Sequence, residues 1–472
     1  PRFALRPAQK PTYGPRIKSG VTKALATSEV TGVLSKSGVT KVLATAGVTK
    51  ALATSEVTGV LADRGDVTER ISILAVFHKM RGSVCYRVSS RNTTPTTSPM
   101  SLLFTPFTFN APSGPLTLPN RIVVAPMCQY SADNGQATDW HLAHWASLLN
   151  SGAGLFTIEA TAVSAVGRIS PGCLGLWDDA TQAALADKLH RARHLAPHMP
   201  VCIQISHAGR KASSAAPWNG GMLIAPENGG WQTVAPSALP HLPQEAPPTE
   251  LSLADLAQIK ADFVNTARRS HALGIEAIEL HAAHGYLLHQ FLSPISNQRS
   301  DAYGGSFENR IRFPLEVFQA VREAFGGTLG MRISGTDWVD GGWTIEETAE
   351  LSTLLKQAGA QFVHISSGGV SPQQKIAIGP EYQVHLAKAV KAASDLTTIA
   401  VGLITEPAQA EAVLQRGDAD LVALARSFLY KPRWGWEAAV ALGGTVDAQH
   451  QYWRSLPREA KNIFNDAKIG MR

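Results

Sequence analysis

Short apolar runs alternate with longer amphipathic stretches along the chain from residue 120 onward. The runs are rich in β-branched residues, as buried parallel strands are, and they cover residues 121–127, 154–163, 200–209, 277–285, 328–335, 362–369, 397–404 and 421–429. Segments with helical periodicity, such as 252–274 and 344–359, separate them. The second of these begins with Thr344 and Glu347 in the spacing of a capping box and ends at Gly359.

A strand followed by a helix, eight times over, predicts a parallel (β/α)8 TIM barrel. An open doubly wound sheet is the alternative, which we disfavour because no GxGxxG motif follows the first strand. In a barrel the chemistry lies at the carboxyl ends of the strands. Polar residues gather there in this sequence: Cys128, Tyr130, Glu159, Gln204, His207, His281, His284, Tyr286, Arg332, Ser366 and Ser367.

The last two strands predict a phosphate site, because barrels often bind phosphate with the loops that follow them. Gly402 permits close approach of the backbone, and Arg426 supplies a charge suited to bidentate binding. The alternative is that Arg426 pairs with a carboxylate on an outer helix.

The first 99 residues are a different kind of sequence. Five tandem nonapeptides, beginning with GVTKALATS, occupy residues 20–64. Residues 1–99 carry 15 Lys and Arg against 5 Asp and Glu. We expect a disordered or non-native basic leader at 1–99 and a folded domain at 100–472, with Met100 as the functional start. A solenoid and an organelle transit peptide are the alternatives, neither of which we favour.

Charge and cysteine content exclude several functions. The remainder of the chain is mildly acidic, with a net charge of −4, which argues against a nucleic-acid surface. No apolar run approaches the roughly 18 residues that cross a membrane. The four cysteines, Cys85, Cys128, Cys173 and Cys202, form no CxxC motif, so we expect a reducing, cytoplasmic location and no metal centre.

Several separated motifs resemble the old yellow enzyme family of flavin-dependent ene-reductases. They are NRIVVAPMCQYSADNGQATDWHLAHW, EATAVSAVGRISPGCLGLWDD, QISHAGRKAS, IELHAAHGYLLHQFLSPISNQRSDAYGGSFENRIRF and ALARSFL, within Leu103 to Arg454. Cys128 and the stretch after HAGRKAS are most similar to the small bacterial subgroup that includes xenobiotic reductases. One departure is Ala425, where the family commonly has Gly.

The resemblance implies non-covalently bound FMN and a reaction in two halves. NADPH or NADH binds transiently and reduces the flavin, which then passes a hydride to an alkene conjugated to a carbonyl or nitro group, such as an enone, a maleimide or a nitroalkene. The pattern of the family implies flavin contacts from Ala125, Pro126, Met127, Cys128, Ala160, Gln204, Arg332, Gly402, Ala425 and Arg426.

Three residues after the fourth strand carry the expected chemistry. His281 and His284 would donate hydrogen bonds to the substrate oxygen, on which negative charge develops, as in an oxyanion hole. Tyr286 would give the α-carbon its proton, since a phenol stays protonated at neutral pH. Tyr130 is expected to contact the substrate, and Cys128 to contact the O4–N5 edge of the flavin.

Two other functions compete for these residues. Glu279, His281 and His284 could ligate a divalent metal in a barrel hydrolase or aldolase. A non-catalytic flavin-binding protein is the other possibility.

Two further regions are expected to shape the site. The segment 210–250 is longer than an ordinary connection between barrel elements. Its length predicts a lid or binding loop, with Trp218 and Trp231 near the substrate. The tail motif QYWR is similar to the small bacterial subgroup, in which a tail arginine enters the neighbouring subunit. Arg454 is the matching residue, so we expect a homodimer at least. The alternative is a surface arginine in a frayed tail.

Overall fold

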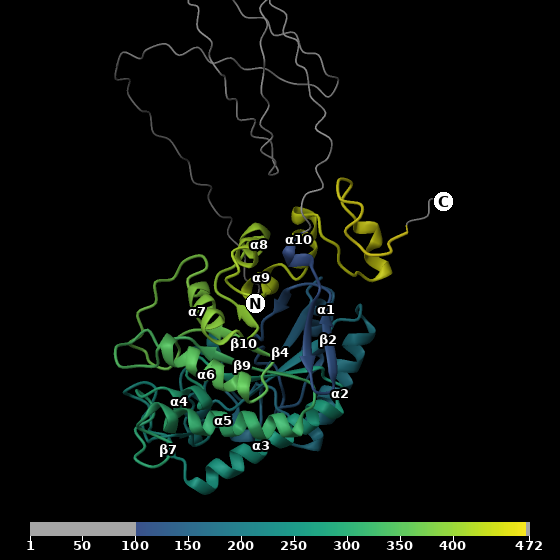
Figure 1. Cartoon of the computed structure of the whole chain (residues 1–472). Helices are drawn as coiled ribbons and strands as arrows, with labels where there is room; N and C mark the ends of the chain where they lie inside the picture. Colours follow the sequence, from purple (N-terminus) through teal and green to yellow (C-terminus); the bar gives the residue numbers. More distant parts are fainter. Residues whose placement is uncertain (1–100, 469–472) are drawn as a thin grey trace, which may run out of the picture. The chain divides into compact units, whose positions relative to one another are not determined.

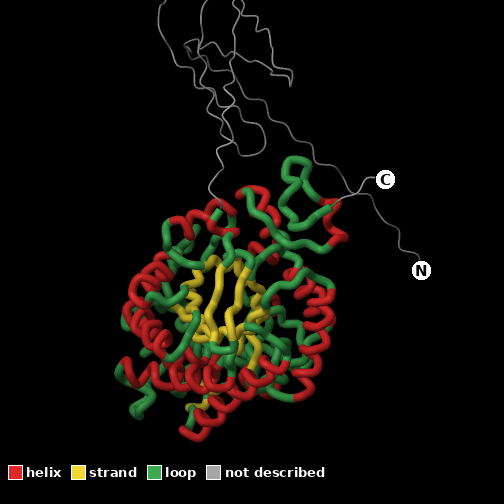
Figure 2. Tube along the Cα trace, turned by 45° about the vertical axis from the view of Figure 1, so that its right-hand side comes forward, coloured by secondary structure: helices red, strands yellow, loops and turns green. Residues whose placement is uncertain are grey.

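Eight parallel strands close into a barrel, and the prediction of a TIM barrel is confirmed. The structure, a computed structural model, describes residues 101–468. The strands follow one another around the ring in chain order, and the ring closes where β12 pairs with β3. They are β3 (Ile122–Val124), β4 (Leu155–Ala162), β5 (Val201–Ser206), β8 (Ala277–Ala282), β9 (Thr328–Ser334), β10 (Phe362–Ser366), β11 (Thr398–Ala400) and β12 (Leu421–Leu424). Figure 2 shows them at the centre, encircled by helices.

The helices form the outer layer (Figure 1). They are α1 (Asp139–Leu149), α2 (Asp179–His194), α3 (Leu253–Ala272), α4 (Leu287–Leu292), α5 (Phe307–Ala324), α6 (Ile345–Gln357), α7 (Val384–Ser394), α8 (Pro407–Gln415), α9 (Arg426–Tyr430) and α10 (Trp434–Leu442). The predicted capping box begins α6. Thr344 Oγ1 accepts from the Glu347 amide at 3.3 Å, and Glu347 Oε2 accepts from the Thr344 amide at 3.0 Å.

A hairpin that the sequence pattern did not reveal closes the amino-terminal end of the barrel. It pairs β1 (Phe107–Ala111) with β2 (Gly114–Leu118). Phe109 packs inside the barrel, where its ring centroid lies 5.5 Å from that of Phe362, the first residue of β10. The remaining short elements are β6 (Val234–Ala235), β7 (Thr249–Glu250) and the 3-10 turns η1 (Leu102–Phe104), η2 (Ala165–Gly167), η3 (Gly209–Lys211), η4 (Pro217–Asn219), η5 (Pro226–Asn228) and η6 (His450–Ser455).

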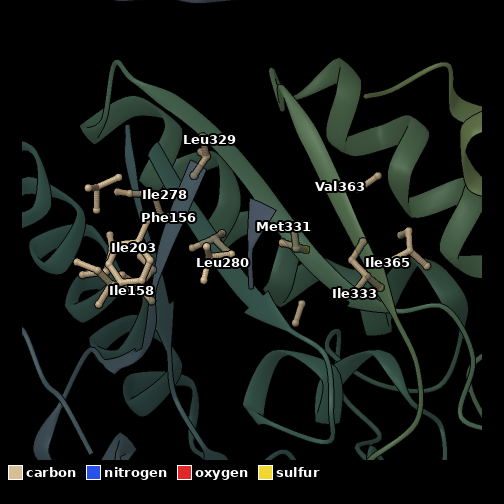
Figure 3. Packing of buried hydrophobic residues seen from close by; sticks show 14 of the residues in the cluster. Phe156, Ile158, Ile203, Ile278, Leu280, Leu329, Met331, Ile333, Val363 and Ile365 are labelled. Atoms are coloured by element: carbon tan, nitrogen blue, oxygen red, sulfur yellow. The ribbon is translucent and has the colours of Figure 1, made fainter. Parts of the chain in front are cut away.

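Alternation along each strand sorts the side chains into two sets. One set points outward and packs against the helices, as Ile278 and Leu280 of β8 and Met331 of β9 do (Figure 3). The other set points inward. Ala277, the first residue of β8, joins a separate apolar cluster at the amino-terminal end of the barrel. Glu279 and His281 follow at intervals of two, so the inner face becomes polar toward the carboxyl end.

The N-terminal predictions are not tested by the fold. The basic leader, its nonapeptide repeats and the start at Met100 lie outside the described residues, and the domain boundary stays a prediction. Within residues 101–468, no helix is long and apolar enough to span a membrane.

A buried carboxylate ties the first described residues to the barrel. Glu411 of α8 accepts hydrogen bonds from the Ser101 hydroxyl at 2.6 Å and from the Leu102 and Leu103 amides, both at 2.9 Å. Burial raises the pKa of Glu411, but these hydrogen bonds outweigh burial and leave that pKa below its usual value. The ionised carboxylate therefore stabilises the fold.

We expect Glu411→Ala to lower the free energy of unfolding by about 1–3 kcal/mol, because it leaves the donors of Ser101, Leu102 and Leu103 without an acceptor. Urea denaturation would measure this loss, with exposed Glu350→Ala as the control. The pKa of Glu411 is lower in the folded state than in the unfolded state. Its contribution to stability is therefore fully present above the unfolded-state pKa, and it is lost as the pH falls through the folded-state pKa. A Glu411→Ala protein as stable as the control variant would contradict this account.

Candidate active site

The end of β8 brings two histidines and a tyrosine together at the carboxyl-terminal end of the barrel, here called the mouth. His281 is the fifth residue of β8, and a tight turn follows in which His284 and Gly285 have φ of 59° and 75°. Tyr286 then caps α4. The His281 ring centroid lies 5.1 Å from that of His284 and 4.8 Å from that of Tyr286. The strand and its turn therefore deliver all three rings to one place.

Hydrogen bonds indicate the tautomers of both histidines. His281 Nδ1 accepts from the Ala283 amide at 3.3 Å, so its proton lies on Nε2. His281 Nε2 is 3.4 Å from His284 Nδ1, and His284 Nε2 is 2.7 Å from Ser366 Oγ. A chain of donors thus runs from β8 to β10. Burial, assisted by the positive charge of Arg332, holds the pKa of both histidines well below the usual value, so both are neutral donors at pH 7.

Tyr286 is a half-buried phenol. Burial, with a smaller effect from Cys128, raises its pKa well above the usual value. It packs beside the cluster formed by Ala160, Ile169, Cys173, Ala208 and Ala212, together with Cys128 and Tyr130. The phenol therefore stays protonated at any physiological pH.

Residues 125–130 follow β3 along one wall of the mouth. The Ala125 amide donates to the Leu424 carbonyl at 2.9 Å, which fixes the start of this segment. The thiol of Cys128 meets that of Cys173. Their hydrogen bond raises the pKa of Cys128, as burial also does, and lowers the pKa of Cys173. Ala160 of β4 lies in the same cluster. The Cys173 contact was missed in the sequence because the two cysteines are far apart in the chain.

A polar layer crosses the inside of the barrel beneath the mouth. Gln204 Nε2 donates to Glu279 Oε1 at 2.7 Å, and His364 Nδ1 lies 2.8 Å from Glu279 Oε2. Arg332 lies on the next strand, opposite both His281 and His364 in register. Its Nε has no hydrogen-bond partner, and no described carboxylate lies within ion-pair distance of it. A buried guanidinium without a partner indicates a site for an acceptor-rich ligand.

Glu279 does not join His281 and His284 in a shared site. Its carboxylate is occupied by Gln204 and His364, while the two other histidines bond to each other. Among residues 101–468, no group of three or more His, Cys, Asp or Glu side chains is arranged to hold a metal ion.

The ends of β11 and β12 form the other side of the mouth. Gly402 has φ of 134°, and a Cβ there would meet Gln383 Cγ at 2.5 Å. Ala425 caps α9, so Arg426 is the first residue of that helix. Arg426 is exposed. In the part of the chain that the structure describes, it makes none of the ion pairs that its alternative role requires.

Two tryptophans of the 210–250 segment, Trp218 and Trp231, lie beside the loops that follow β3 and β4. Tyr130 and Trp218 pack edge to face with ring centroids 5.5 Å apart. Trp231 donates from Nε1 to the Val166 carbonyl at 2.9 Å and packs on the cluster around Cys173. The long segment therefore covers the β3 and β4 loops.

Arg454 lies apart from all these residues. It is exposed within η6, and the tail around it packs on the opposite end of the barrel. There Val446 pairs with Phe464, and a Cβ on Gly152, in the loop that enters β4, would meet Trp436 and Val446. The described chain thus does not bring Arg454 to its own mouth.

Comparisons with known proteins show which family this sequence and fold are similar to. A family model described as "NADH:flavin oxidoreductase / NADH oxidase family" matches residues 102–442. An NADH:flavin oxidoreductase of Gibberella zeae is 42% identical over 386 residues, covering 78% of this chain and 92% of that protein. An NADPH dehydrogenase of a Geobacillus species is 40% identical over 361 residues, covering 75% and 98%. The structure of morphinone reductase in complex with tetrahydroNAD is similar at 26% identity and a TM-score of 0.59, covering 74% of this chain and 93% of that one.

Two glycines let the β8 and β10 loops touch behind the histidines. Gly369 has φ of 94°, and a Cβ there would lie 2.5 Å from the His284 backbone. A Cβ on Gly285 would lie 2.2 Å from the Gly369 carbonyl oxygen.

We expect Gly369→Ala to lower the free energy of unfolding by about 2–4 kcal/mol, from the combined cost of strained φ and overpacking. Gly379→Ala is the control in the same loop, because nothing lies within 4 Å of its Cβ position. Its change should stay within about 0.5 kcal/mol. Equal chemical-denaturation midpoints for the two variants would be inconsistent with the close contact.

Proposed function

This chain belongs to the NADH:flavin oxidoreductase / NADH oxidase family, and we propose that it reduces the carbon–carbon double bond of alkenes conjugated to a carbonyl or nitro group. It is an oxidoreductase of the old yellow enzyme type that uses FMN and NAD(P)H. The observation that carries the proposal is the convergence of two neutral imidazole donors and a protonated phenol at the mouth.

The residues of the mouth fit FMN. The unpartnered Arg332 suits the N1–O2 edge of the flavin ring, because negative charge gathers there on reduction. Gln204 gives one N–H to Glu279, which leaves its carbonyl oxygen and other N–H for the pyrimidine edge. When bound, FMN supplies the two electrons that it has taken from NAD(P)H.

The remaining contacts follow the walls of the mouth. We assign Ala125, Pro126 and Met127 to a backbone wall along the ring, with Ala160 at its pyrimidine edge and Cys128 near O4 and N5. Gly402, Ala425 and Arg426 would take the phosphate. The exposed Arg426 makes no ion pair within the described residues, which supports this role.

The substrate oxygen is assigned to the histidine pair. The inferred tautomers put a proton on Nε2 of each ring. A substrate oxygen would replace His284 Nδ1 and Ser366 Oγ as acceptors, and would gain two fixed donors as its negative charge develops. Neutral imidazoles can do this without losing their own protons.

Tyr286 is assigned as the proton donor to the α-carbon. A protonated phenol beside His281 can donate once the enolate is basic enough to accept. Tyr130 and the edge-on Trp218 are assigned to the outer wall that selects the substrate. Cys128, Cys173 and Cys202 are free thiols, which is compatible with the cytoplasmic location that we also propose.

We further propose a homodimer in which Arg454 acts on the neighbouring subunit. The tail packs at the end of the barrel opposite its own mouth, and Arg454 is exposed there, which supports a role on another chain rather than in its own site. A guanidinium entering an aromatic-lined mouth can stack on a ring there.

We expect Tyr286→Phe to slow alkene reduction about 10²- to 10⁴-fold, the usual worth of a general acid. Stopped-flow reduction of the flavin by NADPH should stay within about twofold, because no proton from Tyr286 is needed. The control is Tyr430→Phe, since Tyr430 is 86% exposed. Unchanged single-turnover alkene reduction in Tyr286→Phe would remove Tyr286 from this role.

The assignment of Arg454 is tested by a point variant. Truncation after Gln451 would also remove Ile463 and Phe464, which are buried. Arg454→Ala should raise KM for the alkene roughly 5- to 10-fold and leave FMN bound. The exposed Arg458→Ala is the matched control. If the two variants have equal KM, or if light scattering shows a monomer, the inter-subunit role fails.

A further inference from the structure

A lysine that the proposed mechanism does not use lies against the proposed proton donor. Lys211 ends η3, and its ammonium donates to the carbonyls of His284 at 2.8 Å and Gly369 at 2.9 Å. The same ammonium lies 5.3 Å from the centroid of the Tyr286 ring. One side chain thus touches the turn that carries the histidines, the β10 loop and the phenol.

The charge of Lys211 is not neutralised by a carboxylate. No Asp or Glu among residues 101–468 lies within ion-pair distance of it. The guanidinium of its neighbour Arg210 likewise donates only to carbonyls, those of Leu239, Pro240 and Val370. Carbonyl oxygens orient these cations but leave their net charge, and Glu245 acts on Lys211 only from beyond ion-pair distance, so Lys211 presents a net positive charge to the phenol.

This arrangement has a chemical consequence for proton donation. The O–H bond of Tyr286 breaks as the C–H bond at the α-carbon forms, and a phenolate remains until solvent returns a proton. Burial opposes that phenolate, as the raised pKa of Tyr286 indicates. A cation against the ring favours the phenolate far more than the neutral phenol.

We propose that Lys211 is a positioning residue for Tyr286: it fixes the turn that carries the phenol and stabilises the phenolate left by proton transfer. This inference rests on the proposed function of Tyr286. It adds a residue from the β5 loop to the groups at the end of β8.

The pH dependence of alkene reduction distinguishes this electrostatic role of Lys211 from a purely structural one. Burial, and next the charge of Arg210, lower the pKa of Lys211 to about 8. The titratable and charged groups facing it are Arg210, His241, Glu245, His281, His284 and Tyr286. The pKa of His241 is lowered to about 4, mainly by burial, and those of His281 and His284 are lowered as well. These histidines are therefore not expected to titrate near pH 8.

The experiment compares Lys211→Met, which removes the charge, with Lys211→Arg, which keeps it. In single-turnover reduction of an enone by pre-reduced holoenzyme, Lys211→Met should be about 10- to 30-fold slower at pH 7. The wild-type rate should fall as pH rises through about 8, and the Met variant should lack that fall. Lys211→Arg should recover most of the rate. Reduction of the flavin by NADPH, and its reoxidation by ferricyanide, should change less than twofold in both.

Lys260→Met, on the outer helix α3, is the control. In a Tyr286→Phe background, Lys211→Met should have no further effect on the rate. The inference is overturned if Tyr286→Phe is slow while Lys211→Met is not. It is also overturned if Lys211→Met raises KM alone or keeps the wild-type pH profile. If Tyr286→Phe itself is not slow, the proposed function of Tyr286 fails first, which is a distinguishable result.

Discussion

Alternation along closed parallel strands is the constraint on which the site depends. Every second side chain of a barrel strand must enter a small enclosed space. In β8 these are Ala277, Glu279 and His281, and they run from the apolar end of the barrel to the mouth. The outward residues Ile278 and Leu280 anchor the same strand against the helices. Packing on the outside therefore determines how accurately the inner polar residues are held.

The charge of the mouth depends on which of its ionisable side chains have hydrogen-bond or ion-pair partners. Glu279 is satisfied by Gln204 and His364, whereas Arg332 and Lys211 have no carboxylate within ion-pair distance among residues 101–468. The result is a buried region with uncancelled positive charge around two neutral imidazoles. Such a region favours a ligand that is anionic or becomes anionic during reaction. Reduced flavin and an enolate are both of this kind.

The sequence predicted the eight barrel strands and the helix cap at Thr344 because these depend on local periodicity and local hydrogen bonds. The β1–β2 hairpin was not predicted: burial does alternate along its two five-residue strands, but they precede the first strand of the eightfold strand–helix repeat. The partners of Glu279, the contact between Cys128 and Cys173, and the position of Lys211 against Tyr286 also escaped prediction. Each joins residues distant in the chain through a register that only the closed barrel fixes. The residues proposed for the flavin came from family motifs rather than from periodicity.

We propose that FMN lies beside the histidine pair and that this pair binds an oxyanion. The most direct measurement is an anaerobic titration of the purified protein with p-chlorophenol, followed by its visible spectrum. We expect a yellow protein that develops a broad long-wavelength charge-transfer band, since a phenolate mimics the enolate. A His281→Ala/His284→Ala protein should stay yellow and lose the band. A colourless wild-type protein, or a band of unchanged affinity in the double variant, would contradict the account.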